Sequence, residues 1–320
     1  MPLVPSNYLP PFWQQNGYVS TIYASKFRVV PTLKQKRERI VLPDNDFLDL
    51  DWSYCAQPKG VVVLLHGLEG NAQRPYITGA VHEFLTAGFD CCAVNLRNCS
   101  DEPNLLYRSY HSGATEDVSS IITHLTNNHN YPSIFLNGFS LGGNLALKYV
   151  GEGNNIPITL KGVVAISTPV DLENSLQQLL HYKNWMYAHH FKKKLVDKLR
   201  NKQQLFPKMI TISEIEKIKT LKDFDDVYTS KAHGFKDAVD YYTKSSALQF
   251  LPQIRIPVLL INALNDSFLG KTCYPTEFAT NSSLLHLETP RFGGHVGFYN
   301  KKGATYTEKR AVNFIETILS

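Results

Sequence analysis

Hydrophobic residues along the chain recur in short continuous runs that alternate with longer stretches of helical periodicity. From Gly60 onwards the runs predict buried strands at 61–65, 91–96, 134–137, 163–167, 257–261 and 284–287. The stretches between and after them predict helices at 76–87, 115–125, 142–150 and around 311–319. This alternation is typical of a parallel sheet with right-handed crossovers, and therefore of a doubly wound α/β domain.

The N-terminal part follows a different pattern. Residues 39–42 and 48–52 flank the turn-forming sequence Pro43-Asp44-Asn45-Asp46, which predicts an antiparallel pair of strands. The first ~20 residues hold four prolines among aromatic residues, so we expect them to run extended over the surface.

The strand signal is interrupted once. Between residues 171 and 250 the pattern is helical and richer in lysine and tyrosine, and strand signals resume only near residue 256. We therefore expect an α/β core in two parts, residues 1–170 and 251–320, with a helical cap inserted at residues 171–250.

One serine lies in the setting that nucleophilic catalysis needs. Ser140 is the centre of Gly138-Phe139-Ser140-Leu141-Gly142, directly after a predicted strand and before a predicted helix. In such a nucleophile elbow the glycines allow a sharp turn that exposes the serine hydroxyl. The alternative is a glycine-rich turn that contains serine by chance. A serine hydroxyl is a weak nucleophile at neutral pH, so a base and an orienting carboxylate are needed as well.

The carboxylate and the base are expected after the serine, in that order along the chain. Asp266 follows the predicted strand at 257–261 after a short turn, and its neighbour Asn265 carries no charge. His295 lies in Gly293-Gly294-His295-Val296-Gly297, just past the last predicted strand. We therefore predict a catalytic triad of Ser140, Asp266 and His295.

Acyl transfer at such a serine also needs donors for the tetrahedral oxyanion, typically two backbone N–H groups. Leu141, the residue after the nucleophile, is expected to supply one. The loop His66-Gly67-Leu68-Glu69-Gly70 follows the first core strand, and Leu68 is expected to supply the other. We expect the His66 imidazole and Gly67 to support this loop rather than to act in the chemistry.

With these motifs the chain resembles the α/β-hydrolase superfamily and, within it, the YheT-like group of esterases and hydrolases. The resemblance covers most of the chain, from about Tyr8 to the C-terminus. It implies an α/β-hydrolase fold, with a mostly parallel doubly wound sheet, antiparallel N-terminal strands and an inserted helical cap. Its motifs are His66-Gly67-Leu68-Glu69-Gly70, His111-Ser112-Gly113, Thr115-Glu116-Asp117, Gly138-Phe139-Ser140-Leu141-Gly142-Gly143-Asn144, Gly293-Gly294-His295-Val296-Gly297-Phe298, Phe224-Asp225 and Tyr241-Tyr242.

The family triad carries over onto Ser140, Asp266 and His295. The resemblance implies hydrolysis of carboxylic esters with short to medium acyl chains. The chain departs from the group at Asn98, where glycine is usual, and at Ser267, where proline is usual. Neither change touches a triad atom.

Charge and cysteine content give no sign of nucleic-acid binding, of disulfide bonds or of a bound metal. A net charge of +5 over 320 residues is a weak bias that gives no reason to expect nucleic-acid binding. Five cysteines without a secretory signal favour reduced thiols and a cytoplasmic location. No cofactor or metal is expected, since the cysteines lack metal spacing and His189-His190 has no acidic or cysteine partner.

A basic run is the remaining feature of note. We interpret it as the solvated face of a helix, with weak association with an anionic membrane surface as the alternative. Its members are Lys192, Lys193, Lys194, Lys198, Arg200 and Lys202.

The sequence thus predicts a serine esterase that forms an acyl-enzyme with a small-molecule ester, and no obligate partner is implied. The first alternative is an acyltransferase, which uses the same residues and passes the acyl group to an alcohol. The second is a non-catalytic α/β-hydrolase that binds a ligand or partner, and the presence of every triad member argues against it.

Overall fold

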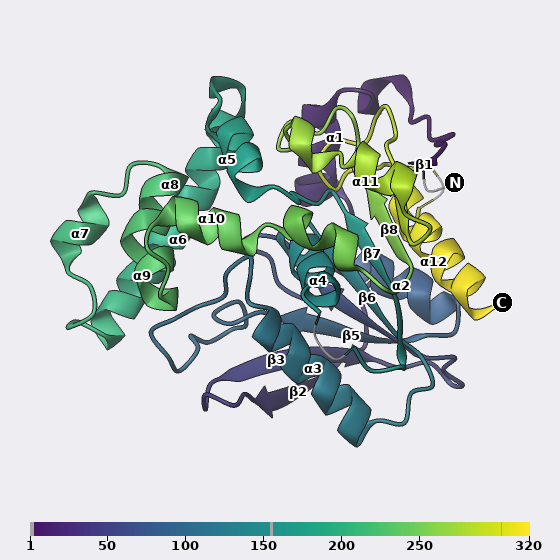
Figure 1. Ribbon diagram of the computed structural model, residues 1–320, viewed down its shortest axis with the longest axis horizontal. Helices are drawn as coiled ribbons and strands as arrows, with labels where there is room; N and C mark the ends of the chain where they lie inside the picture. The colour runs from purple at the N-terminus through teal and green to yellow at the C-terminus, as the bar shows by residue number, and fades with distance from the viewer. Residues whose placement is uncertain (1–2, 154–155, 302) are drawn as a thin grey trace.

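The centre of the protein is a twisted sheet, seen in a computed structural model that describes residues 3–153, 156–301 and 303–320 (Figure 1). Within these residues the sheet has nine strands in the order β1-β9-β8-β7-β6-β4-β5-β3-β2. Strand β3 runs antiparallel to both of its neighbours, and the other adjacent strands are parallel. The strands are β1 (Leu3–Val4), β2 (Lys36–Val41), β3 (Phe47–Ser53), β4 (Val61–Leu65), β5 (Asp90–Asn95), β6 (Ile134–Phe139), β7 (Leu160–Ile166), β8 (Val258–Ile261) and β9 (Leu285–Glu288).

The continuous apolar run of β4 follows from burial on both faces of the sheet. Val61, Val63 and Leu65 belong to one hydrophobic cluster, and Val62 and Leu64 belong to a second cluster on the opposite face. The first cluster includes side chains of α3 (Thr115–Asn128) and α4 (Leu141–Gly151), and the second includes those of α2 (Pro75–Thr86) and α12 (Tyr306–Leu319). The predicted doubly wound α/β fold is therefore confirmed.

The N-terminal segment becomes helical from Phe12 onwards, so the prediction of an extended chain is wrong for that part, whereas residues 5–11 contain no helix. Residues Phe12–Gln14 form a 3₁₀ turn, α1 spans Gly17–Ile22, and a π-helical turn follows at Tyr23–Phe27. The Asn16 side chain caps α1 by accepting hydrogen bonds from the backbone N–H groups of residues 18 and 19. The prolines all precede this cap, so they do not prevent a helix after it.

A group of helices follows β7 and precedes β8. Figure 1 shows α6, α7, α8 and α9 gathered to one side of the sheet. This segment has two hydrophobic clusters of its own, one around Phe224 and Tyr228 and the other around Tyr241 and Tyr242. The helices are α5 (Leu172–Leu180), α6 (Trp185–Leu205), α7 (Ile212–Glu216), α8 (Leu221–Phe224), α9 (Ser230–His233) and α10 (Ala238–Ser245).

The remaining short helix, α11 (Thr276–Asn281), joins β8 to β9, after a 3₁₀ turn at Lys271–Cys273. Two further 3₁₀ turns, Tyr182–Asn184 and Ala247–Gln253, lie at the start of α6 and just before β8. None of the helices among the described residues combines the length and the apolar character that a bilayer crossing requires.

The basic run on α6 is not the wholly solvated face that the sequence suggests, and that interpretation needs correction. Lys202 is 1% exposed, and its ammonium donates to the carbonyl oxygens of Asn104 and Leu106. Lys198 forms an ion pair with the buried carboxylate of Glu69, at 3.1 Å. These lysines attach α6 to the core loops, because a long lysine side chain can bury its methylenes when its ammonium finds acceptors.

Candidate active site

The strand-to-helix turn between β6 and α4 presents Ser140 in a strained conformation. Its φ is +53°, a value that few residues other than glycine adopt. The flanking glycines have no room for a side chain: a Cβ at Gly138 would lie 2.3 Å from the carbonyl oxygen of Gly142. A Cβ at Gly142 would lie 2.3 Å from the carbonyl oxygen of Leu65. The local sequence therefore provides the tight turn that a nucleophile elbow requires.

The structure brings the three predicted triad residues together. The distance between Ser140 Oγ and His295 Nε2 is 3.0 Å, and that between His295 Nδ1 and Asp266 Oδ2 is 2.8 Å. With its proton on Nδ1, His295 donates to Asp266 and accepts from the Ser140 hydroxyl. The other carboxylate oxygen of Asp266 accepts from the backbone N–H of Phe268 at 2.9 Å. The Asp266 side chain is fully buried. This arrangement can move a proton from the serine onto the imidazole.

Two hydroxyl groups hold the loop that carries His295. The backbone N–H of His295 donates to Thr21 Oγ1 at 2.8 Å, and that of Val296 donates to Ser167 Oγ at 2.9 Å. Thr21 lies on α1 and Ser167 directly follows β7. Neither residue can be predicted from the sequence, because nothing in the local sequence of either one indicates contact with a loop so distant along the chain.

The two predicted oxyanion donors lie beside Ser140. Leu68 and Leu141 line the same cavity as Ser140. Gly67 passes so close that a Cβ there would lie 3.0 Å from the Ser140 Cβ. Neither leucine N–H donates to another group of the described residues, so both remain free for a ligand oxygen.

The His66 imidazole supports the loop, as the sequence analysis expects. Its Nδ1 lies 2.8 Å from the carbonyl oxygen of Gly67, and its Nε2 accepts from the backbone N–H of Leu96 at 3.2 Å. These partners place the proton on Nδ1. Burial lowers the pKa of His66 to about 4, so the ring stays neutral and its two hydrogen bonds persist at neutral pH.

A cavity of about 600 Å³ opens onto Ser140 and His295, a size typical of small-molecule sites. Much of its wall is apolar, and the segment that follows β7 contributes a large share. The N-terminal segment also lines the cavity, through residues that include Thr21 and Ile22. Apolar lining residues from α5 and α6 are Leu172, Leu176, Leu179, Trp185, Met186, Phe191 and Leu195.

Two positions that differ from the family pattern are accommodated locally. Asn98 has a φ of +63°, in the left-handed region where glycine is most at ease and asparagine is better tolerated than most residues. Ser267 Oγ donates to the side-chain oxygen of Asn184, and the Asn184 amide donates to the Ser267 carbonyl oxygen. The serine thus links the loop that carries Asp266 to the start of α6.

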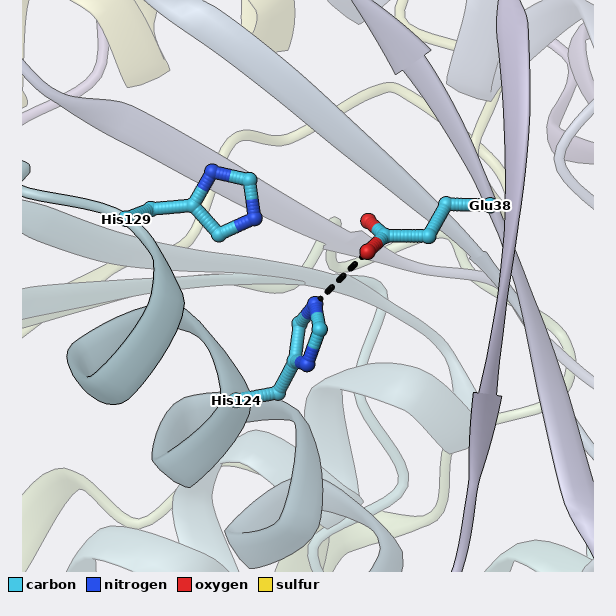
Figure 2. Close-up of side chains that lie close together, drawn as sticks. All are labelled: Glu38, His124 and His129. Atoms are coloured by element: carbon cyan, nitrogen blue, oxygen red, sulfur yellow. Dashed lines mark hydrogen bonds and ion pairs between the residues drawn. The ribbon is translucent and has the colours of Figure 1, made fainter.

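Side chains able to hold a metal ion lie elsewhere. Within the described ranges, the group with suitable ligand atoms close together is Glu38, His124 and His129, and none of these lines the cavity (Figure 2).

Comparison with known proteins agrees with this geometry. The chain is 32% identical over 299 residues to Escherichia coli (strain K12) YheT, whose name describes an esterase, covering 92% of this chain and 87% of that protein. It is 27% identical to Homo sapiens phospholipase ABHD3, covering 99% of this chain and 80% of that protein. A Pyrococcus furiosus esterase structure superposes with a TM-score of 0.61 at 16% identity, covering 92% of this chain and 96% of that one.

A Saccharomyces cerevisiae (strain ATCC 204508 / S288c) monoacylglycerol lipase is 27% identical over 276 residues, covering 84% of this chain and 60% of that protein. The sequence model of the alpha/beta hydrolase fold matches residues 60–299, three quarters of the chain. The fold, the position of Ser140 at its turn and these matches lead to one assignment. The chain belongs to the α/β-hydrolase superfamily and, within it, to the YheT-like group.

Proposed function

We propose that the protein is a serine hydrolase of carboxylic esters that uses Ser140, His295 and Asp266 as its triad. The observation that carries this proposal is the continuous hydrogen-bonded chain from Ser140 Oγ through His295 to the buried Asp266, at the base of an apolar cavity. Relatives described as an esterase, a phospholipase and a monoacylglycerol lipase support ester hydrolysis as the reaction class.

The reaction follows from the positions of these atoms. Ser140 Oγ attacks the ester carbonyl carbon while His295 Nε2 takes the hydroxyl proton. The backbone N–H groups of Leu68 and Leu141 stabilise the negative oxygen of the tetrahedral intermediate. The carbon–oxygen bond to the leaving alcohol then breaks, and His295 returns the proton to that alcohol. A water molecule repeats the sequence on the acyl-enzyme and releases the acid.

The inserted segment at residues 171–250 acts in this proposal as the cap that forms the acyl pocket. Support comes from the apolar side chains of α5 and α6 in the cavity wall. The cavity volume of about 600 Å³ fits short to medium acyl chains. An alcohol in place of water would make the same chemistry an acyl transfer, which product analysis with added alcohol detects.

A fluorophosphonate probe tests the nucleophile. We expect the probe to label the unaltered protein and to leave Ser140→Ala unlabelled. Ser25→Ala is the matched control, because Ser25 lines the same cavity and its hydroxyl donates only to the carbonyl oxygen of Ile22. Equal labelling of all three proteins, or no hydrolysis of p-nitrophenyl esters of graded length, would contradict the proposal.

A further inference from the structure

Three cationic side chains from distant parts of the chain line the cavity. Lys26 comes from the turn after α1, Arg74 directly precedes α2, and Lys194 lies on α6. Lys26 is exposed, while Arg74 and Lys194 are partly buried. We refer to Lys26, Arg74 and Lys194 as the cationic cluster.

The cationic cluster has no counterion of its own. None of its members forms an ion pair with a carboxylate of the described residues, and Arg74 donates only to the backbone oxygen of Glu69, at 2.9 Å. The Glu69 carboxylate is already engaged, since it accepts from Tyr110 and pairs with Lys198. No carboxylate in the described part of the chain forms an ion pair with the cluster, and its positive charge is offset only in part, by the nearby charge of Glu69, which acts to raise the pKa of Lys194.

The other carboxylate of the cavity wall outside the triad does not neutralise the cluster either. Asp225 accepts hydrogen bonds from Thr229 and Tyr242, at 2.6 and 2.7 Å. Burial raises its pKa to about 6, so the carboxylate stays largely ionised at neutral pH, but its oxygens are held by these two hydroxyl groups and form no ion pair with the cluster.

The members of the cluster lie close enough to repel one another. Burial lowers the pKa of Lys194, and the positive charges of Arg74 and Lys26 lower it further. The same three cations lower the pKa of His190, which also lines the cavity and is chiefly affected by burial. Cations that are partly removed from water and lack a counterion are costly to the folded state, and an anionic ligand group relieves that cost.

We propose that the cationic cluster is a binding subsite for an anionic group, a phosphate or a carboxylate, carried by the ester substrate. The inference rests on the proposed ester hydrolysis and narrows its substrate to esters with one apolar chain and one anionic group. The apolar wall of α5 and α6 receives the chain, and Lys26, Arg74 and Lys194 receive the anion. Their ammonium and guanidinium groups suit either anion, since charge-assisted hydrogen bonds form with both.

Chain-matched esters test this subsite. We would measure kcat/KM for phenyl butanoate and for its analogues with a para-carboxylate or a para-phosphate group. The anionic-to-neutral ratio of kcat/KM is expected to fall about tenfold or more in Lys194→Gln, the effect of one charge-assisted hydrogen bond. Lys193→Gln, at a neighbouring exposed position outside the cavity wall, should keep the ratio of the unaltered protein.

Comparison of the anionic-to-neutral ratio for the para-phosphate and the para-carboxylate esters distinguishes a phosphate site from a carboxylate site. A ratio that is the same in Lys194→Gln, in Lys26→Gln and in the unaltered protein, for both anions, would overturn the proposal. Lys26→Gln serves as a second test in case Lys194→Gln misfolds, because Lys26 is exposed and its substitution should leave the fold intact. If no ester is hydrolysed, the proposed function fails separately, and calorimetric binding of the intact esters to Ser140→Ala still tests the subsite.

A second, independent observation concerns the edge of the sheet that β2 forms, away from the cavity. Glu38 on β2, His124 on α3 and His129 just beyond α3 point toward one another (Figure 2). Each offers a ligand atom, and these atoms all lie within 4.8 Å of one another. His124 Nε2 and Glu38 Oε1 are 3.0 Å apart. All three side chains are only partly buried, so ions from solvent can reach them.

Neighbouring side chains contact these three residues and fix their orientation, as the groups around the ligands of a metal site commonly do. Trp52 Nε1 donates to the second oxygen of Glu38 at 2.7 Å. The His129 ring stacks on Trp52, with ring centroids 4.8 Å apart, which fixes the plane of its imidazole. Neutral imidazole and ionised carboxylate are the forms that bind metals.

We infer that Glu38, His124 and His129 form a site for a borderline divalent ion such as Zn²⁺. Two imidazoles and one carboxylate are a zinc ligand set, and the ligand atoms need to approach by about 1 Å to reach Zn–ligand distances near 2.1 Å. The ion would join the C-terminal end of α3 to β2, so it should stabilise the fold rather than take part in the chemistry. The expectation from sequence that the chain has no metal site considered only cysteine spacings and His189-His190.

Calorimetry and thermal unfolding with Zn²⁺ alone test this site after treatment of the protein with a chelator. We expect binding of one ion and a higher Tm in the unaltered protein, and the loss of both effects in His124→Gln and in His129→Gln. His82→Gln is the matched control, because the His82 ring hydrogen-bonds to the carbonyl oxygen of Pro31, lies outside the group of three ligands and should leave binding intact. Absence of Zn²⁺ binding, or equal binding in all the variants, would overturn the inference.

Discussion

Thr21 accepts a hydrogen bond of 2.8 Å from the backbone N–H of His295, a residue 274 positions further along the chain. The bond attaches the histidine loop to α1, and Thr21 Oγ1 in turn donates to the backbone oxygen of Gly17 at 2.7 Å. The N-terminal segment therefore helps to fix the imidazole that faces Ser140. Since a misplacement of about 1 Å can cost a hundredfold in rate, this contact should matter to catalysis.

The substitution Thr21→Val should lower kcat about tenfold or more while changing KM little. Valine keeps the shape of threonine but removes the oxygen that accepts from the His295 N–H, so the loop loses one fixed point. Thr21→Ser restores the oxygen and should recover most of the rate. Steady-state kinetics on a p-nitrophenyl ester measures both variants. A loss of rate that Thr21→Ser does not recover would mean that packing, and not this hydrogen bond, positions the loop.

The substitution Asp266→Asn should lower kcat by roughly 10³ to 10⁴, with the fold retained. The neutral amide no longer stabilises the His295 cation or holds the ring with its proton on Nδ1. Asn265→Asp is a useful partner variant, because it places a carboxylate next to the mutated site. A loss below about tenfold in Asp266→Asn, with unchanged Tm, would show that another carboxylate supports the imidazole.

The sequence predicts the sheet and the candidate triad well because the signals that define them are local. The apolar run at residues 61–65 matches β4 residue for residue, and the glycines around Ser140 indicate its turn directly. The elbow strain and the position of the serine before α4 both follow from five consecutive residues.

The sequence does not predict features that depend on contacts between distant residues. Thr21 has no local feature that indicates its bond to His295, and α1 is short enough for its capping residue, Asn16, to be overlooked. Lys202 belongs to a strongly basic stretch, which by itself indicates an exposed side chain. Its burial depends instead on two carbonyl oxygens of a loop nearly a hundred residues away. The pattern of a helix predicts its amphipathic face, but not the acceptors that a neighbouring loop offers.

Acid should destabilise the protein through two buried histidines whose rings are in contact. The rings of His111 and His233 have centroids 4.2 Å apart. Burial lowers the pKa of His233 to about 4 and that of His111 well below its usual value, and the charges of Arg97 and Arg108 add to both effects. The folded state therefore binds fewer protons than the unfolded chain below pH 6.5. Through His233, stability should fall as pH drops from about 6.5 to 4, by at most about 1.4 kcal/mol per pH unit, and His111 adds to the fall in the same direction.

The substitution His233→Phe should reduce this dependence. Phenylalanine keeps an aromatic ring beside His111 but takes up no proton, and neither ring nitrogen of His233 has a hydrogen-bond partner among the described residues to lose. Denaturant unfolding between pH 4 and 7 should give a shallower slope for His233→Phe. His181→Phe, at an exposed position, should keep the original slope. Equal slopes for all three proteins would contradict the assignment.

The acyl-chain preference should depend on Leu179, whose side chain lines the cavity from α5. Each methylene buried in an apolar pocket contributes about 0.8 kcal/mol, so kcat/KM should rise roughly fourfold per carbon until the cavity ends. Leu179→Trp fills part of the cavity and should shift the preferred p-nitrophenyl ester to a shorter chain, with little change toward the acetate. Leu180→Trp is the matched control, since the neighbouring Leu180 is 42% exposed and lies outside the cavity wall. If Leu179→Trp and Leu180→Trp share one chain-length profile, the acyl chain must lie along the core and not along α5.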